Sequence, residues 1–257
     1  MTVVLPAPVL LVLAGVGAGL SGSMAGLASL FSYPALLAVG LPPTVANQTN
    51  TIALATSSIG SIVSSRPELR GQRARVLRLL PLTVLGGVIG GALVLVTPSE
   101  TFALIVPFLV GGASLVLLRP PRPAEPGTAR AARSPGRPGP ATVLGAIAIG
   151  VYSGYFGAAA GVLMLALLSR LLADTLVRVN AVKNVLLGAS NAVAAIGFIV
   201  LGHVAWSAAL PLTAGLLVGN YTGPAIARRL PPTVLRVGIA VAGLVLAVVL
   251  FVDAVRG

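Results

Sequence analysis

Long apolar blocks alternate with short polar or proline-rich connections along the whole chain. Eight of these blocks are long enough for a membrane-spanning helix, which needs about 20 predominantly apolar residues. They cover residues 5–40, 47–65, 79–96, 102–118, 141–172, 180–201, 207–226 and 233–252. The pattern predicts an all-α integral membrane protein that crosses the bilayer several times.

Two of the blocks are too long for one straight helix and carry glycine and serine at their centres. These soft centres lie at 17–26 in the first block and at 150–161 in the fifth. The 32 residues of the block at 141–172 divide into two helices of roughly 15 residues, each shorter than a full span. We therefore expect each block to fold back as a broken or re-entrant hairpin. The alternative is that the glycines only let unbroken helices pack closely.

The second half of the chain repeats the order of short motifs in the first half. The matched motifs are Ser21-Gly22 with Ser153-Gly154, Val45-Ala46-Asn47 with Arg178-Val179-Asn180, Pro81-Leu82-Thr83 with Pro211-Leu212-Thr213, and Gly90-Gly91 with Gly219-Asn220. Their offsets stay between 129 and 133 residues. We predict a first membrane repeat over residues 1–118 and a second over 141–257. The linker between them, 119–140, is rich in Pro, Arg, Gly and Ala and is expected to be flexible and cytoplasmic.

Composition and charge indicate where the protein is located and which of its loops face the cytoplasm. Of the 257 residues, 56% are hydrophobic and only 9% are charged, against about 25% in a typical soluble domain. Much of the formal net charge of +12 comes from arginines at 66–78 and 119–137. No aromatic residues for base stacking are interleaved with them, which argues against nucleic acid binding, and such loops normally face the cytoplasm. The predominance of Arg over Lys indicates a bacterial source, so we expect a multi-pass protein of the bacterial inner membrane.

This charge bias makes the two predicted repeats opposite in orientation. With 66–78 and 119–140 inside, the block at 47–65 runs inward, and the first hairpin enters from outside. Arginines at 228–236 place the loop before the last block inside, so the hairpin at 141–172 enters from the inside. Each half is then a glycine-rich hairpin plus three transmembrane helices. Inverted repeats with interrupted helices are typical of secondary transporters, whose substrate site lies between the repeats near the midplane.

A set of polar residues follows each predicted hairpin. The first set is Asn47, Asn50 and Thr51, and the second is Asn180, Lys183 and Asn184. In both sets the spacing i, i+3, i+4 puts the three side chains on one helix face, and we expect the two faces to converge near the repeat interface. Lys183 is the only lysine, and a charge within a span indicates function by default. Alternatively, Lys183 extends to the inner headgroups.

These groups suit an anionic ligand. Lysine supplies positive charge, asparagine amides donate hydrogen bonds, and broken helix ends present backbone N–H groups with a positive partial charge. The hairpin centres are expected to contribute Ser21, Gly22, Ser153, Gly154 and Gly157, where glycine lets a ligand approach the backbone closely. No acidic residue lies deep in a predicted span. That argues against a cation site built on carboxylates and against a carboxylate proton relay.

The sequence offers little for catalysis, a metal or a cofactor. It has no cysteine, no HExxH motif and no serine nucleophile elbow. The one histidine, His203, falls in a predicted outer loop, where it and Trp206 are best interpreted as interfacial residues. We expect no enzyme activity and no cofactor.

Five segments resemble the sulfite exporter TauE/SafE family of membrane permeases. They are GLSGSMAG at 19–26, VANQTNT at 45–51, SGYFG at 153–157, VNAVKN at 179–184 and GHVAW at 202–206. The resemblance runs in order over nearly the whole chain. It implies a duplicated helical bundle, a possible homodimer and transport of small sulfur-containing anions such as sulfite, thiosulfate or sulfoacetate. The first hairpin departs from the pattern, because Ser23-Met24-Ala25 stands where the second hairpin has Phe156-Gly157.

The residues and the resemblance together predict a permease that exports a small sulfur oxyanion or organosulfonate by alternating access. Two other classes stay open at this point. One is an anion channel on the same scaffold. The other is a membrane partner or sensor that transports nothing, in which the two polar faces would pair with each other.

Overall fold

The computed structural model of the protein describes residues 6–118, 139–172 and 174–227, with short stretches between 237 and 252. Over these residues the fold is all-α, as predicted, and has no strand. The helices are α1 (Ala7–Ala25), α2 (Ser29–Ala38), α3 (Pro43–Ser64), α4 (Arg66–Leu69), α5 (Arg73–Val96), α6 (Ser99–Leu118), α7 (Pro140–Tyr155), α8 (Ala160–Leu171), α9 (Leu176–Leu201) and α10 (Trp206–Ala227). Nearly all of the predicted linker and the arginines at 228–236 lie outside the described residues, so the proposed repeat boundaries stay predictions.

Each of the two longest apolar blocks contains two helices separated by a short break. α1 ends at Gly26, which caps it with a φ of +72°, and α2 begins at Ser29. α7 ends at Tyr155, and α8 begins at Ala160, after Gly157 and Ala159 with φ values of +74° and +57°. Glycine adopts this left-handed conformation freely, whereas alanine adopts it at a cost. The predicted breaks at the glycine-rich centres are confirmed. How the hairpins enter the membrane stays a prediction.

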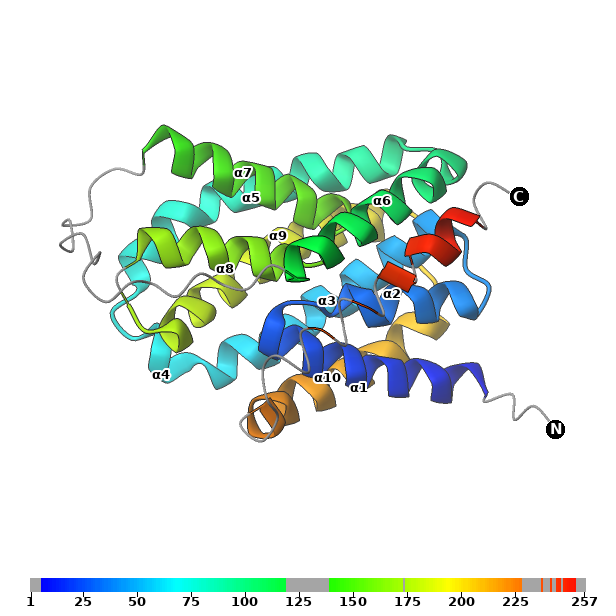
Figure 1. The fold of residues 1–257 in the computed structure, drawn as a ribbon, viewed down its shortest axis with the longest axis horizontal. Helices are drawn as coiled ribbons and strands as arrows, with labels where there is room; N and C mark the ends of the chain where they lie inside the picture. Colours follow the sequence, from blue (N-terminus) through cyan, green and yellow to red (C-terminus); the bar gives the residue numbers. More distant parts are fainter. Residues whose placement is uncertain are drawn as a thin grey trace.

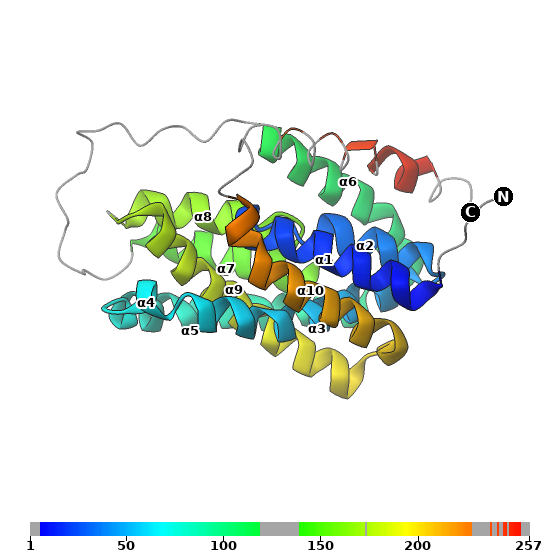
Figure 2. The same ribbon diagram turned by 90° about the horizontal axis from the view of Figure 1, so that it is seen from below.

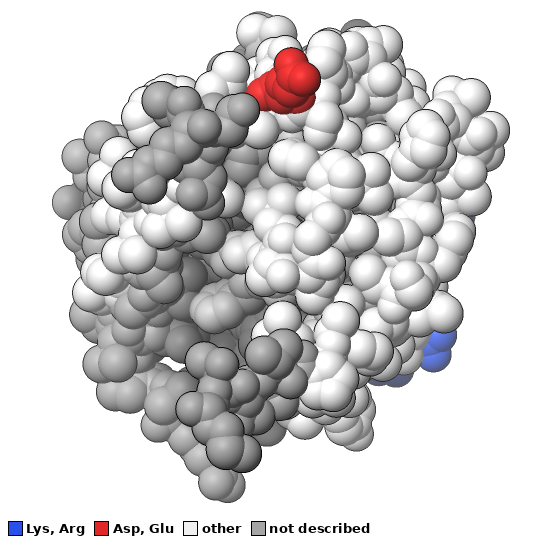
Figure 3. Space-filling model, turned by 90° about the vertical axis from the view of Figure 1, so that its right-hand side faces the viewer, with Lys and Arg blue, Asp and Glu red and all other residues white. Residues whose placement is uncertain are grey.

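The connections between helices gather at two ends of the bundle (Figure 1). α4, the start of α7 and the α8–α9 turn lie on the left in this view, and we call this the basic end because it carries the arginines between 66 and 78. The start of α1 and the α2–α3, α5–α6 and α9–α10 connections lie on the right, at what we call the opposite end. Figure 3 looks onto the opposite end, where blue basic side chains appear only at the rim of the described surface. Such a charge asymmetry is what positively charged cytoplasmic loops produce.

Two helix pairs bring the first and second halves of the chain into close backbone contact. α1 packs along α10, and α5 packs along α7 (Figures 1 and 2). Glycines line both contacts: Gly15 and Gly19 face Gly215 and Gly219, and Gly86 and Gly90 face Gly150 and Gly154. A Cβ atom on Gly150 would lie 2.7 Å from the carbonyl oxygen of Thr83 and 3.1 Å from the Cα of Gly86. Small residues at this spacing let helix backbones approach each other inside a membrane.

The bundle is apolar on its outside and polar along its centre. Phe108, Val200 and Leu210 are 68%, 71% and 67% exposed, whereas Asn47 and Asn50 have no exposed surface at all. A soluble protein normally shows the reverse distribution. α5 and α9 are each long and apolar enough, by length and composition, to cross a bilayer. This distribution suits a bundle surrounded by lipid.

Candidate functional site

The first half of α3 carries a continuous buried polar segment. Its five members are Asn47, Gln48, Thr49, Asn50 and Thr51, all at most 5% exposed. The Asn47 Nδ2 donates a 2.8 Å hydrogen bond to the carbonyl oxygen of Tyr155, the last residue of α7. The Asn50 Nδ2 donates to the Oγ of Ser29, the first residue of α2, at 3.3 Å. α3 is therefore tied to both broken hairpins, close to the break in each.

Gln48 and Thr49 have a different role, which the spacing of polar residues did not predict. The backbone N–H of His203 donates to Gln48 Oε1 at 2.7 Å, and the backbone N–H of Ala205 donates to Thr49 Oγ1 at 3.1 Å. The two side chains thus satisfy backbone groups in the connection between α9 and α10, at the opposite end. Five uninterrupted polar residues inside an apolar block are the signal that could have identified them.

The second polar set lies on α9, which runs antiparallel to α3 (Figure 1). Lys183 is 2% exposed, while Asn180 and Asn184 are partly exposed. The register of the two helices follows from three contacts. Arg178 Nη2 donates to the carbonyl oxygen of Arg70 at the basic end, Gly188 faces Ser58 in the middle, and Gln48 meets His203 at the opposite end. Lys183 and Asn50 therefore lie on different sides of the Ser58–Gly188 contact.

At 1.5 Å of rise per residue, this register separates Asn50 and Lys183 by roughly 20 Å along the helices. The prediction that the two polar faces converge near the repeat interface is wrong for Asn50 and Lys183, because antiparallel packing places corresponding residues of α3 and α9 towards different ends. The first set lies towards the opposite end and the second towards the basic end. Whether each residue binds substrate stays a prediction.

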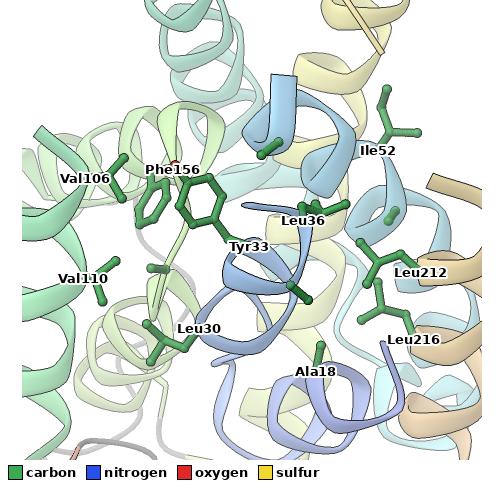
Figure 4. Packing of buried hydrophobic residues seen from close by; sticks show 14 of the residues in the cluster. Ala18, Leu30, Tyr33, Leu36, Ile52, Val106, Val110, Phe156, Leu212 and Leu216 are labelled. Atoms are coloured by element: carbon green, nitrogen blue, oxygen red, sulfur yellow. The ribbon is translucent and has the colours of Figure 1, made fainter. Parts of the chain in front are cut away.

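The two hairpin breaks meet in the interior of the bundle. A Cβ on Gly26 would lie 2.5 Å from the Cα of Gly161, so the two backbones touch at the start of α8. Tyr33 of α2 packs edge-to-face on Phe156, with ring centroids 5.2 Å apart (Figure 4). The Tyr152 hydroxyl donates a 2.6 Å hydrogen bond to the carbonyl oxygen of Ala158 and so bridges the break after α7. Movement of one hairpin must therefore disturb the other.

The remaining predicted site residues lie beside these breaks with distinct partners. Ser153 donates to Asn191 Oδ1 at 2.9 Å, which links the end of α7 to α9. Ser21 donates to the carbonyl oxygen of Ala18 in its own helix at 3.0 Å. Gly22 lies against Ala28 across the first break, and Gly154 lies against the backbone of Gly87. In the described residues no three His, Cys, Asp or Glu side chains are grouped as metal ligands.

A hydrogen-bonded ion-pair network joins the two halves at the basic end. Asp174, in the α8–α9 turn, accepts from Gln72 Nε2 at 3.1 Å, Arg75 Nη1 at 2.5 Å and Arg178 Nε at 3.0 Å. Partial burial alone would raise the pKa of Asp174, but the hydrogen bonds from Arg75, Thr175 N–H and Arg178 lower it to about 2. Ionised Asp174 therefore holds the start of α5 against the start of α9.

We expect Asp174→Asn to lower the melting temperature of the purified protein by about 2–4 °C, the shift that ~1 kcal/mol produces in a chain of this size. The pKa of Asp174 in the folded state lies below its unfolded value of about 3.9, so the stabilisation is fully present above that pH and is lost as the pH falls towards 2. Melting curves of wild type and variant at pH 7 and pH 3 measure this. The difference should shrink at pH 3, and Glu100→Gln, at an exposed residue, is the control. An equal difference at both pH values would contradict the ion-pair account.

A helical bundle that is apolar outside, polar along its centre and built around two touching helix breaks defines a helical membrane protein. A family model described as "Sulfite exporter TauE/SafE" matches residues 11–250, and the chain belongs to this family of membrane transporters. The chain is similar to the "Probable membrane transporter protein YfcA" of Escherichia coli K12, with 29% identity over 214 residues, 83% of this chain and 76% of that protein. The same values hold for the proteins of that name in E. coli strains CFT073 and O157:H7. No solved structure gives a significant match.

Proposed function

We propose that the protein carries a small sulfur-containing anion, such as sulfite, thiosulfate or an organosulfonate, outward across the bacterial inner membrane by alternating access. The observation that carries the proposal is the meeting of both hairpin breaks beside the buried polar segment of α3. Interrupted helices that meet in a bundle interior are where transporters of this kind bind their substrates. The sulfur-containing cargo rests on the family.

The helix contacts favour two inverted repeats as the moving units. α1 begins the first hairpin and packs on α10, while α7 begins the second hairpin and packs on α5. α5 and α10 hold corresponding places in the two predicted repeats. The first hairpin thus packs on the second half of the chain, and the second hairpin packs on the corresponding helix of the first half. A two-fold axis within the membrane plane would relate two such contacts. Each hairpin is held by the other half, which suits rocking of one unit against the other.

Charge favours an anion over a cation as the cargo. Lys183 is buried in α9, and no acidic side chain pairs with it in the part of the chain that the structure describes. A buried charge without a partner is costly, and an anionic substrate supplies one. The first turns of α2 and α8, each without a side-chain cap, add the positive partial charge of helix N-termini.

Uptake into proteoliposomes tests the proposal. Purified protein is first screened by thermal shift against sulfite, thiosulfate, sulfoacetate, sulfate and taurine, and the best ligand is used in radiolabelled form. We expect uptake that saturates and is accelerated by unlabelled substrate inside the vesicles. Saturable uptake without acceleration from inside would identify an anion channel, and no uptake of any of these compounds would indicate a membrane partner that transports nothing.

A further inference from the structure

The buried polar segment of α3 contains two hydrogen-bond acceptors with nothing to accept. The Oδ1 atoms of Asn47 and Asn50 are both fully buried, and neither has a donor in the described residues. Buried carbonyl oxygens in native proteins almost always have a donor, so each exception calls for an explanation. The two residues are spaced i, i+3 and lie on the same face of α3.

The orientation of Asn47 follows from its partner. Its Nδ2 donates to the carbonyl oxygen of Tyr155, which can only accept. Rotating the amide would bring two acceptor oxygens together, so the Asn47 oxygen must be the group left over. Asn50 donates through its Nδ2 to Ser29 Oγ at 3.3 Å, and in this conformation its oxygen has no donor. A hydroxyl can donate as well as accept, so it is the partner of Asn47, and not that of Asn50, that fixes an amide orientation. Both amides are therefore anchored to broken hairpins by their donors and present acceptors.

A positive pole for an anion lies beside these acceptors. Ser29, which contacts Asn50, is the first residue of the ten-residue helix α2, and this helix has no side-chain cap at its N-terminus. The N–H groups of Leu30 and Phe31 already donate to the carbonyl oxygens of Leu27 and Ala28, so what this helix N-terminus offers a sulfonate or similar anion is its positive partial charge. One end of a small ligand can therefore sit on α2 while its other end meets the amide oxygens of α3.

We infer that the substrate carries a hydrogen-bond donor in addition to its anionic group, and that Asn47 and Asn50 select for that donor. The inference rests on the proposed function and narrows it. Within sulfur-containing anions it favours hydroxy- and aminosulfonates over compounds that only accept, such as thiosulfate or the dianion of sulfoacetate. A site built to receive an O–H or N–H discriminates strongly against a ligand that lacks it, because the buried acceptors then stay unpaired.

Access to the acceptors requires a movement. Both oxygens are sealed from solvent in this conformation, with α7 against Asn47 and α2 against Asn50. Because each amide is hydrogen-bonded to a hairpin at its break, displacement of either hairpin exposes one of them. The same contacts that select the ligand thereby couple its arrival to the position of the hairpins.

Three ligands with one skeleton test the inference: ethanesulfonate, isethionate (the 2-hydroxy form) and taurine (the 2-amino form). Binding to the purified full-length protein is measured by isothermal titration calorimetry. We expect isethionate and taurine to bind at least about tenfold more tightly than ethanesulfonate. In Asn47→Leu and Asn50→Leu this preference should fall towards unity while ethanesulfonate binding persists. Asn220→Ala, which removes a partly buried asparagine of α10, should keep the preference.

Asn50→Asp tests the same site by strengthening the preference for taurine, and it does not require the buried site to accommodate a leucine. The Ser29 hydroxyl can donate to the new carboxylate, so the geometry is retained, and the added negative charge should favour the ammonium of taurine over the hydroxyl of isethionate. A thermal shift caused by Na⁺ alone and lost in Asn50→Leu would overturn the inference, since the oxygens would then hold an alkali cation. Equal binding of all three sulfonates would overturn it too, while leaving the proposed function intact. Only failure of every sulfur-containing anion in the uptake assay would remove that function.

Discussion

Lys183→Ala is expected to abolish sulfur-anion uptake into proteoliposomes while the protein stays folded. Lys183 lies about two turns inside α9 and is only 2% exposed, so its side chain is held within the bundle and does not extend outward to headgroups. In the described residues its charge has no acidic partner. If the substrate is that partner, removal of the charge removes the attraction that brings an anion into the basic half of the bundle.

Initial uptake rates and melting temperatures of wild type, Lys183→Ala, Lys183→Met and Lys183→Arg separate a binding role from a structural one. The methionine variant keeps the length of the side chain without its charge, so it should be at least as stable as wild type and equally inactive. The arginine variant should keep part of the activity because it keeps the charge. Normal uptake in the alanine variant would make Lys183 a structural residue.

Gly150→Ala is expected to destabilise the protein by several degrees or prevent its accumulation in the membrane. The added methyl group would lie 2.7 Å from the carbonyl oxygen of Thr83 and 3.1 Å from the Cα of Gly86, and both obstacles are backbone atoms of α5. Overpacking of this kind costs about 1–3 kcal/mol, which corresponds to roughly 2–12 °C for a chain of this size. The helices α5 and α7 would have to move apart at this contact.

Gly197→Ala is the matched control, because a Cβ at this position in α9 meets no atom within 4 Å. In open space a helical Gly→Ala change stabilises by up to about 1 kcal/mol. Melting curves and expression levels of the two variants, measured side by side, should therefore move in different directions. If both variants behaved alike, the glycine stripe between α5 and α7 would not be the close contact described above.

The pattern of apolar and polar residues predicted most of the architecture. Hydropathy predicted the helices, and the glycine-rich centres at 17–26 and 150–161 predicted both helix breaks. Glycines also line the close contacts between helices, so glycine content alone does not distinguish a break from a close contact. The arginines between 66 and 78 lie at the same end of the bundle as the start of α7 and the α8–α9 turn, as predicted, while the side of the membrane that this end faces stays a prediction.

Partners and register were harder to predict. The spacing of polar residues around Asn50 and Lys183 showed that each lies on a polar helix face. Such spacing does not show which other helix packs against that face. The antiparallel alignment of α3 with α9, fixed by contacts such as Ser58 with Gly188, separates them. The contact of Ser29 with Asn50 was not predicted either, because a single serine at the start of an apolar segment forms no recognisable sequence pattern. Its role depends on Asn50, which comes from a different helix.

The pairing of α1 with α10 also sets an order of events during biosynthesis. At 5–20 residues per second, the roughly 180 residues between the end of α1 and the start of α10 take about 10–40 s to synthesise. Throughout that interval the nascent chain holds Gly15 and Gly19 in the membrane without the helix that covers them. A ribosome that stalls before Gly215 leaves an exposed small-residue seam, the kind of surface on which quality-control proteases and foreign helices can act. The close contact of α1 is thus completed only after α10, near the C-terminal end of the chain, has been synthesised.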